Sequence, residues 1–190
     1  MVHPKSGERL VFDVHGDSIT DGSGQFLGGL VTFKDVTELS NRIVAQQLEN
    51  EQQFESIANM IPPMVWTTTP NGMHDWFSQR WYDYTGLTPA ESLGQGWRLP
   101  FHPDDMPETA KRWAHSLATG DEYITEYRCQ RHDGEWRWML GRALPLRDAQ
   151  GKITRWFGTC TDIHELVETR QEAKGLREQL LRVIEHARVT

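Results

Sequence analysis

The sequence predicts an α+β fold, a five-stranded antiparallel sheet with helices on one face, flanked by two long connecting helices. Three observations predict it. Five segments of β-type sequence lie between residues 64 and 161, two before a helical stretch and three after it. Tight turns join neighbouring segments within each group, which makes those strand pairs antiparallel. Each strand offers one apolar face, so helices on that one face suffice to cover the sheet.

The N-terminal region contains a strand pair and then a connecting helix. Residues 10–36 read as two short strands around the turn Asp21-Gly22-Ser23-Gly24, whose glycines tolerate a positive φ. Residues 39–61 are polar, with apolar side chains mostly three to seven positions apart, and Pro62-Pro63 ends the pattern. We therefore expect residues 39–61 to form a linker helix.

Residues 62–163 contain every element of the sheet and its helical cover. The first two strands are Met64–Thr69 and Met73–Ser78, around the turn Pro70-Asn71-Gly72. Helical segments follow, each ended by a glycine, at Arg80–Tyr84, Pro89–Leu93 and Pro103–Thr119. The last three strands are Tyr123–Arg131, Glu135–Leu146 and Ile153–Thr161. These residues form one complete domain.

Residues 164–190 form the second long helix. One heptad position holds Leu166, Ala173, Leu180 and Ala187, and the position three residues later holds Thr169, Leu176, Val183 and Thr190. Such a seam is typical of a parallel two-stranded coiled coil, although Ala and Thr weaken it at half of its positions. The pattern predicts a homodimer through helices 39–61 and 164–190.

An internal repeat links the two ends of the chain. Residues 17–39 align with residues 144–166 at a constant offset and without a gap. The identical pairs are Asp21/Asp148, Gly24/Gly151, Thr32/Thr159, Asp35/Asp162, Glu38/Glu165 and Leu39/Leu166. Because both blocks end a β pattern and begin a helix, residues 1–38 are predicted to be the C-terminal tail of a preceding domain of the same fold.

Composition excludes several classes of protein. A chain of 190 residues has room for about one domain with attachments, and its net charge of −7 argues against a nucleic-acid or anionic-membrane surface. It contains neither a run of about 20 apolar residues nor a signal peptide, and its two cysteines lack zinc or disulfide spacing. We expect a cytoplasmic protein with no membrane span, no nucleic-acid partner and no metal site.

A series of short motifs resembles a known family in both order and spacing. The motifs are Ile61-Pro62-Pro63-Met64-Val65-Trp66, Tyr84-Thr85-Gly86, Leu93-Gly94-Gln95-Gly96-Trp97, His102-Pro103-Asp104-Asp105, Glu126-Tyr127-Arg128, Asp133-Gly134, Trp136-Arg137-Trp138 and Gly158-Thr159-Cys160-Thr161-Asp162-Ile163. From about Phe54 to Glu165 the chain resembles a PAS domain of the Trp-rich sensory subclass with its PAC motif, and residues 1–38 resemble the end of another. The resemblance implies a cytosolic sensory module, as in bacterial histidine kinases and diguanylate cyclases.

The tryptophans are the candidate lining of a ligand pocket. The candidates are Trp66, Trp76, Trp81, Trp97, Trp113 and Trp138, together with His115. The alternative is that the indoles fill the core, because a small domain encloses little more volume than they need. Trp136 and Trp138 share one face of a strand and Arg137 and Met139 the other, and the sequence leaves open which face is the inner one.

The cofactor remains unknown at this point. His115 lies on the helix that, by the resemblance, supplies the axial haem ligand in haem-binding PAS proteins, so a haem is one possibility. The resemblance also makes a covalent flavin unexpected, since the Asn-Cys-Arg-Phe-Leu motif of flavin light sensors is absent. The cluster His102-Pro103-Asp104-Asp105 is interpreted as a helix start in preference to a metal or acid–base site.

Signal relay is assigned to four residues where a strand gives way to a helix: Asp35, Asp162, Ile163 and Glu165. An aspartate there can accept hydrogen bonds from the first N–H groups of the helix and fix its direction. On the neighbouring hairpin, Glu126, Arg128 and Arg137 predict a cross-strand ion pair.

The sequence thus predicts a sensory module that relays binding of a ligand or partner through helix 164–190 to an output domain. No catalytic residue is identified, and no glycine-rich ATP motif occurs. His186 lacks the surroundings of a phosphoacceptor, so the chain would be the regulatory fragment of a histidine kinase or diguanylate cyclase whose chemistry lies beyond Thr190. A ligand-free dimerisation module and a haem-binding gas or redox sensor are the alternatives.

Overall fold

The computed structural model describes residues 9–189, which form two compact units dividing after Phe54. The first unit contains strands β1 (Phe12–Thr20) and β2 (Phe26–Asp35), paired as a two-stranded antiparallel sheet. It also contains most of helix α1 (Thr37–Met60), whose last residues belong to the second unit.

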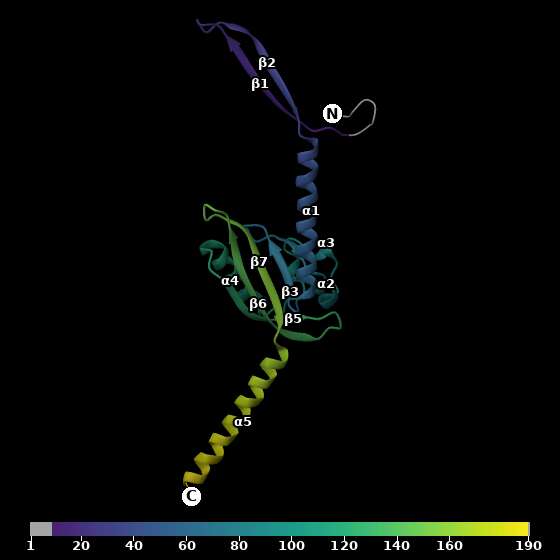
Figure 1. Ribbon diagram of the computed structural model, residues 1–190. Helices are drawn as coiled ribbons and strands as arrows, with labels where there is room; N and C mark the ends of the chain where they lie inside the picture. The colour runs from purple at the N-terminus through teal and green to yellow at the C-terminus, as the bar shows by residue number, and fades with distance from the viewer. Residues whose placement is uncertain (1–8, 190) are drawn as a thin grey trace. The chain divides into compact units, whose positions relative to one another are not determined.

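The second unit is a five-stranded sheet with helices on one face (Figure 1). Its elements in chain order are β3 (Met64–Thr68), β4 (His74–Phe77), α2 (Gln79–Thr85), α3 (Pro89–Ser92), the 3₁₀ turn η1 (Gly96–Arg98), α4 (Met106–Thr119), β5 (Tyr123–Gln130), β6 (Trp136–Arg147), β7 (Ile153–Asp162) and α5 (His164–Val189). The strand order is β4-β3-β7-β6-β5 and every pair is antiparallel. The predicted fold class is confirmed.

The core lies between the inner face of the sheet and the helical layer. Alternate residues of β5 are buried, so this strand turns Tyr123, Tyr127 and Cys129 inward. The helical layer contributes one buried indole each from α2, η1 and α4: Trp81, Trp97 and Trp113.

Gly158 on the central strand β7 allows the sheet and an indole to meet closely. Its neighbour across the ladder is Trp66 on β3, and a Cβ at position 158 would overlap the Trp66 ring. Only glycine leaves room for the indole to lie flat over the strand.

Helix α4 begins three residues later than predicted. Residues 103–105 form a turn, and α4 starts at Met106 with Pro107 in its first turn. The reason is that the Asp105 side chain does not cap the helix. It instead accepts hydrogen bonds from the backbone N–H, Nε and Nη2 of Arg128 at 2.8–2.9 Å. The cluster His102–Asp105 therefore joins the start of α4 to β5.

The β1–β2 hairpin reproduces the geometry of the β6–β7 hairpin. Phe12 pairs with Asp35 as Met139 pairs with Asp162, and both ladders shift register at the equivalent step near the turn. Asp21 and Asp148 each accept a hydrogen bond at 2.9 Å from the backbone N–H four residues on. The difference lies at the edges, because β6–β7 is flanked by β5 and β3 whereas β1–β2 forms a sheet of two.

Candidate functional site: an aromatic cavity and a strand–helix junction

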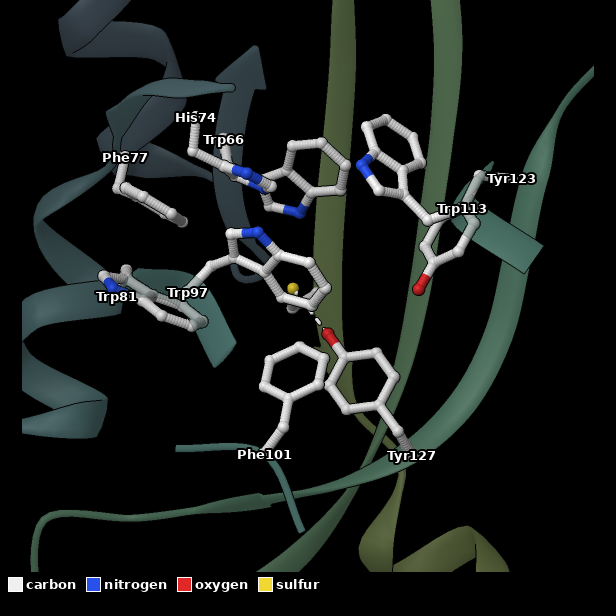
Figure 2. Close-up of a pocket in the computed structure, with 10 residues that line it drawn as sticks. Trp66, His74, Phe77, Trp81, Trp97, Phe101, Trp113, Tyr123 and Tyr127 are labelled. Carbon is white, nitrogen blue, oxygen red and sulfur yellow. Dashed lines mark hydrogen bonds between the residues drawn. The ribbon is translucent and has the colours of Figure 1, made fainter. Parts of the chain in front are cut away.

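A small cavity lies in the core between the sheet and the helices (Figure 2). It is lined by Trp66, His74, Phe77, Trp81, Trp97, Phe101, Trp113, Tyr123, Tyr127 and Cys160. The free space among these side chains is about 20 Å³. A cavity needs roughly 10–15 Å³ by this measure to admit one water molecule, so aromatic rings fill most of the interior.

The rings pack in the geometries that aromatic side chains prefer. Phe101 stacks on Tyr127 with centroids 4.1 Å apart, and Phe77 stacks on Trp81 at 4.7 Å. Trp113 meets Trp66 edge-on at 5.7 Å. Offset stacks and edge contacts of this kind add to the stabilisation from burial and hold the cavity walls in place.

Trp81 and Tyr127 of the cavity lining have hydrogen-bond partners, whereas two other polar groups of the lining have none among the described residues. The Trp81 Nε1–H donates to Ser92 Oγ at 3.0 Å, and the Tyr127 hydroxyl donates to Cys160 Sγ at 2.9 Å. By contrast, His74 Nδ1 and Trp97 Nε1 are buried and find no hydrogen-bond partner within residues 9–189. The cavity therefore contains unmet hydrogen-bonding capacity.

Burial also keeps the cavity uncharged. It lowers the pKa of His74 to about 3, so the imidazole is neutral at physiological pH. It raises the pKa of the Cys160 thiol to about 11 and places the pKa of Tyr127 well above its usual value. A guest in this cavity would meet hydrogen-bonding groups and aromatic faces, and no counter-ion.

Four of the seven predicted pocket residues line the cavity: Trp66, Trp81, Trp97 and Trp113. The other three do not line it. Trp76 precedes the inward-facing Phe77 on β4, so it lies on the outer face of the sheet.

Trp138 and His115 are also outside the cavity. Trp138 alternates with the buried Met139 and lies on the outer face, under the guanidinium of Arg128 at 5.5 Å. His115 is on the solvent side of α4 with its side chain 66% exposed, and its Nε2 is 3.3 Å from Asp121 Oδ2.

Six residues of the cavity lining were not among the candidates, and His74 is the one among them with a ring nitrogen left unpaired by the described part of the chain. The ladder between β3 and β4 shifts register after Thr67, so that His74 pairs with Thr68 and turns to the same face as Phe77. Simple alternation along β4 places the two side chains on opposite faces, since they are three positions apart. This bulge brings the imidazole into the cavity, and no pattern in the sequence predicts it.

The residues present do not fit a haem or a flavin. Ligands of drug size occupy pockets of roughly 300–1,000 Å³, far more than the free space in this core. The candidate haem ligand, His115, lies on the solvent side of α4.

Asp162 joins the sheet to helix α5. Its Oδ1 accepts a hydrogen bond from the backbone N–H of His164 at 2.9 Å, and its Oδ2 accepts one from Arg137 Nε at 2.7 Å. The next residue, Ile163, donates its backbone N–H to the carbonyl oxygen of Trp138 at 2.9 Å. Glu165 follows in the first turn of α5, where a negative charge suits the helix dipole.

Asp35 has the same position at the start of α1. Its Oδ1 accepts a hydrogen bond from the Thr37 backbone N–H at 2.9 Å, and hydrogen bonds from Thr37 lower its pKa. Val36 donates its backbone N–H to the Val11 carbonyl at 3.0 Å, as Ile163 does to Trp138. Both junctions are therefore built alike.

The predicted ion pair within the β5–β6 hairpin is replaced by pairs with other elements. Arg128 binds Asp105 at the start of α4, and Arg137 binds Asp162. Glu126 is 3.6 Å from Arg170 on α5. These charges therefore connect strands β5 and β6 to the start of α4 and to the β7–α5 junction.

The comparisons with known proteins agree with this architecture. Residues 74–160 match the model of the PAS fold family, and the five-stranded domain is a PAS domain. The chain is 38% identical over 157 residues to the uncharacterized protein y4lL of Sinorhizobium fredii, covering 83% of this chain and 19% of that protein. It is 37% identical over 113 residues to the peroxide stress-activated histidine kinase mak1 of Schizosaccharomyces pombe, covering 57% of this chain and 7% of the kinase.

Solved structures show the same fold. A sensory box histidine kinase/response regulator from Burkholderia thailandensis superposes with a TM-score of 0.53 at 22% identity, covering 68% of this chain and 98% of that one. The chain spans less than a fifth of the length of each of the two curated relatives named above. Within the described residues, no helix is both long and apolar enough to cross a membrane.

Proposed function

We propose that this chain is a cytoplasmic sensory module in which a change in the aromatic cavity alters the direction of helix α5. The relationship to histidine kinases supports a role in signal sensing. The observation that carries the relay is the double role of Asp162, which binds Arg137 on β6 and the first N–H of α5 with its two carboxylate oxygens. A shift of β6 against β7 would change both of these hydrogen bonds.

The route from cavity to helix is short. Cys160 lines the cavity and lies two residues before Asp162 on β7, where it accepts the hydrogen bond of Tyr127 from β5. A guest that moves these side chains would displace the end of β7. Because α5 follows β7 directly, a displacement there would tilt the helix.

The outward-facing apolar residues of both long helices support a homodimer. Leu39, Ile43 and Leu48 on α1 are exposed, as are Leu166, Leu176 and Leu180 on α5. A second copy of the chain would cover them in a coiled coil with a weak seam, so two registers would differ little in free energy. The seam position Thr190 lies outside the described residues.

We propose that the output domain belongs to a histidine kinase, with a diguanylate cyclase as the alternative. The curated relatives are several times longer than this chain, which supports a regulatory role within a larger protein.

We also propose that residues 12–35 are the last two strands of a preceding PAS domain. Their register, turn and junction match those of β6 and β7 residue for residue. Val14, Val31 and Phe33 occupy the positions that face the core in the complete domain, and they are exposed. Flanking strands and helices of such a domain would cover this face and both open edges.

The relay can be tested by measuring how α5 responds to the Asp162 junction. A spin label at Gln171→Cys in the full chain reports the distance between the two α5 helices of a dimer. Asp162→Asn keeps a capping oxygen but removes the charge that binds Arg137, so we expect a changed distance distribution. Asp35→Asn is the matched control, since Asp35 occupies the equivalent position at the start of α1. An unchanged distribution in Asp162→Asn would refute the relay.

A ligand-free dimerisation module is the second candidate, and the small free volume of the cavity favours it. Native mass spectrometry separates the two candidates. A sensor purified with its ligand carries extra mass per protomer, whereas a pure dimerisation module has the mass of two chains alone.

A further inference from the structure

Two buried polar groups of the cavity lack a hydrogen-bond partner among the described residues, unlike the Trp81 indole and the Tyr127 hydroxyl. His74 and Trp97 are only 7% and 5% exposed, and their ring centroids are 5.4 Å apart. Neither His74 Nδ1 nor Trp97 Nε1 meets a hydrogen-bond partner in the described part of the chain. A buried group without a partner loses the hydrogen bonds it had with water and recovers none, which makes it a candidate for contact with a bound molecule.

The backbone fixes the two groups relative to one another. His74 and Gly94 exchange two backbone hydrogen bonds, at 2.8 and 3.3 Å, which attach the segment before η1 to strand β4. Trp97 follows three residues later on η1. The imidazole is further held by a parallel stack on Phe77, with an interplanar angle of 8°. Both groups are therefore positioned before any guest arrives.

The surroundings define what kind of molecule these groups could hold. Of the ten lining side chains none carries a formal charge at neutral pH, because burial keeps His74 neutral. An ion would enter without a counter-ion, at a large desolvation cost. The indole N–H can only donate, so the guest must present an acceptor, and the neutral imidazole can donate or accept. The free space of about 20 Å³ limits the guest to a few non-hydrogen atoms.

We propose that His74 and Trp97 are the hydrogen-bonding groups of a site for one small uncharged molecule that carries an oxygen acceptor, such as a simple amide or alcohol. The Trp97 indole donates to that oxygen, and the His74 imidazole pairs with the remaining polar group. This inference rests on the proposed function in that it names the class of ligand for the same cavity.

Formamide and formate provide a matched pair of probes. They have the same number of non-hydrogen atoms and similar shapes, and they differ in charge. In the full chain labelled with ¹⁵N, the indole signal of Trp97 should shift saturably with formamide, with a dissociation constant on the order of 1 mM for a ligand of this size. Formate should produce no saturable shift. The indole signal of Trp81, already paired with Ser92, should stay in place and serves as the internal control.

The variant His74→Phe keeps the stack on Phe77 and removes the imidazole nitrogen. Formamide binding should weaken about tenfold, as expected for the loss of one hydrogen bond. The matched control His115→Phe makes the same change on the solvent side of α4 and should bind as the unmodified chain does. The comparison of formamide with formate needs no variant, so it decides the matter even if His74→Phe fails to fold.

The proposal would be overturned by the absence of a saturable shift of Trp97 with formamide, by equal binding of formate, or by equal binding of formamide by a folded His74→Phe variant. A cross-peak from water at the Trp97 indole without a response to formamide would assign the space to structural water and also overturn it. Formamide binding that leaves the α5 distances unchanged would support the site and contradict the proposed relay. The two ideas can therefore fail separately.

Discussion

The buried imidazole of His74 should make the stability of the domain depend on pH between about pH 6.5 and pH 3. Its pKa is about 3 in the folded protein and 6.5 when unfolded. The unfolded chain therefore binds an extra proton as the pH falls below about 6.5, while the folded protein excludes it. The free energy of unfolding should have its full value above about pH 6.5 and should fall progressively as the pH is lowered toward 3.

The size of the effect follows from the two pKa values. Between about pH 7.5 and pH 5.0 the unfolded state gains about 2 kcal/mol from protonating this one imidazole, which lowers the free energy of unfolding by the same amount. The rings against His74 come from Trp66, Phe77, Trp97 and Trp113, none of which titrates in this range. The loss therefore belongs to the imidazole itself.

Urea denaturation of the unmodified chain and of His74→Phe at both pH values isolates this contribution. Carboxylates with lowered pKa values contribute equally to both proteins and cancel in the difference. We expect the unmodified chain to lose about 2 kcal/mol more than His74→Phe on going to pH 5.0. Equal losses in the two proteins would refute the argument, because they would mean that the folded domain accepts the proton.

Three further predictions concern packing, charge and thiol reactivity. Gly158→Ala should lower the free energy of unfolding by about 1–3 kcal/mol, since its methyl group would overlap the Trp66 indole; urea denaturation measures it. Asp105→Asn should cost about 2 kcal/mol by the same assay, because Arg128 loses a bidentate, mostly buried partner. Both cysteines are buried and the pKa of Cys160 is about 11, so neither thiol should react with a thiol reagent at about pH 8 until urea unfolds the domain.

The two substitutions have matched controls. Gly175→Ala changes an open position on α5 and should leave the stability of the sheet unchanged. Asp104→Asn changes an exposed neighbour 3.7 Å from Arg128 and should cost much less than Asp105→Asn. A stable Gly158→Ala variant, equal costs at the two aspartates, or rapid labelling of the native protein would contradict the respective prediction.

The architecture was predictable because its signals are local. Turn residues such as Asn71-Gly72 and Asp133-Gly134 separate the strands, and glycines such as Gly86 and Gly120 end the helices with a positive φ. Alternation along β5 then identifies its buried face. Each of these features depends on residues within a few positions, so the sequence carries them directly.

The lining of the cavity was harder to predict, because it depends on which face of each strand turns inward. Trp136 and Trp138 could not be assigned to a face from alternation alone, and the structure places Trp138 outside. The position of His74 depends on the bulge between β3 and β4. The role of Asp105 depends on a partner 23 residues away, Arg128, which a helix-start pattern does not reveal.

The equivalence of the two hairpins makes the chain divisible at matched points. Val36 and Ile163 follow strands of the same register and precede helices that begin with the same backbone bond to an aspartate. Joining Val36 directly to His164 would remove residues 37–163, a unit of one connecting helix and one PAS domain. The backbone geometry at the new junction would match that of the original one. Inserting a second copy of this unit at the same point would also leave the local backbone geometry unchanged. The number of such units in series can therefore change without redesigning the connections between them.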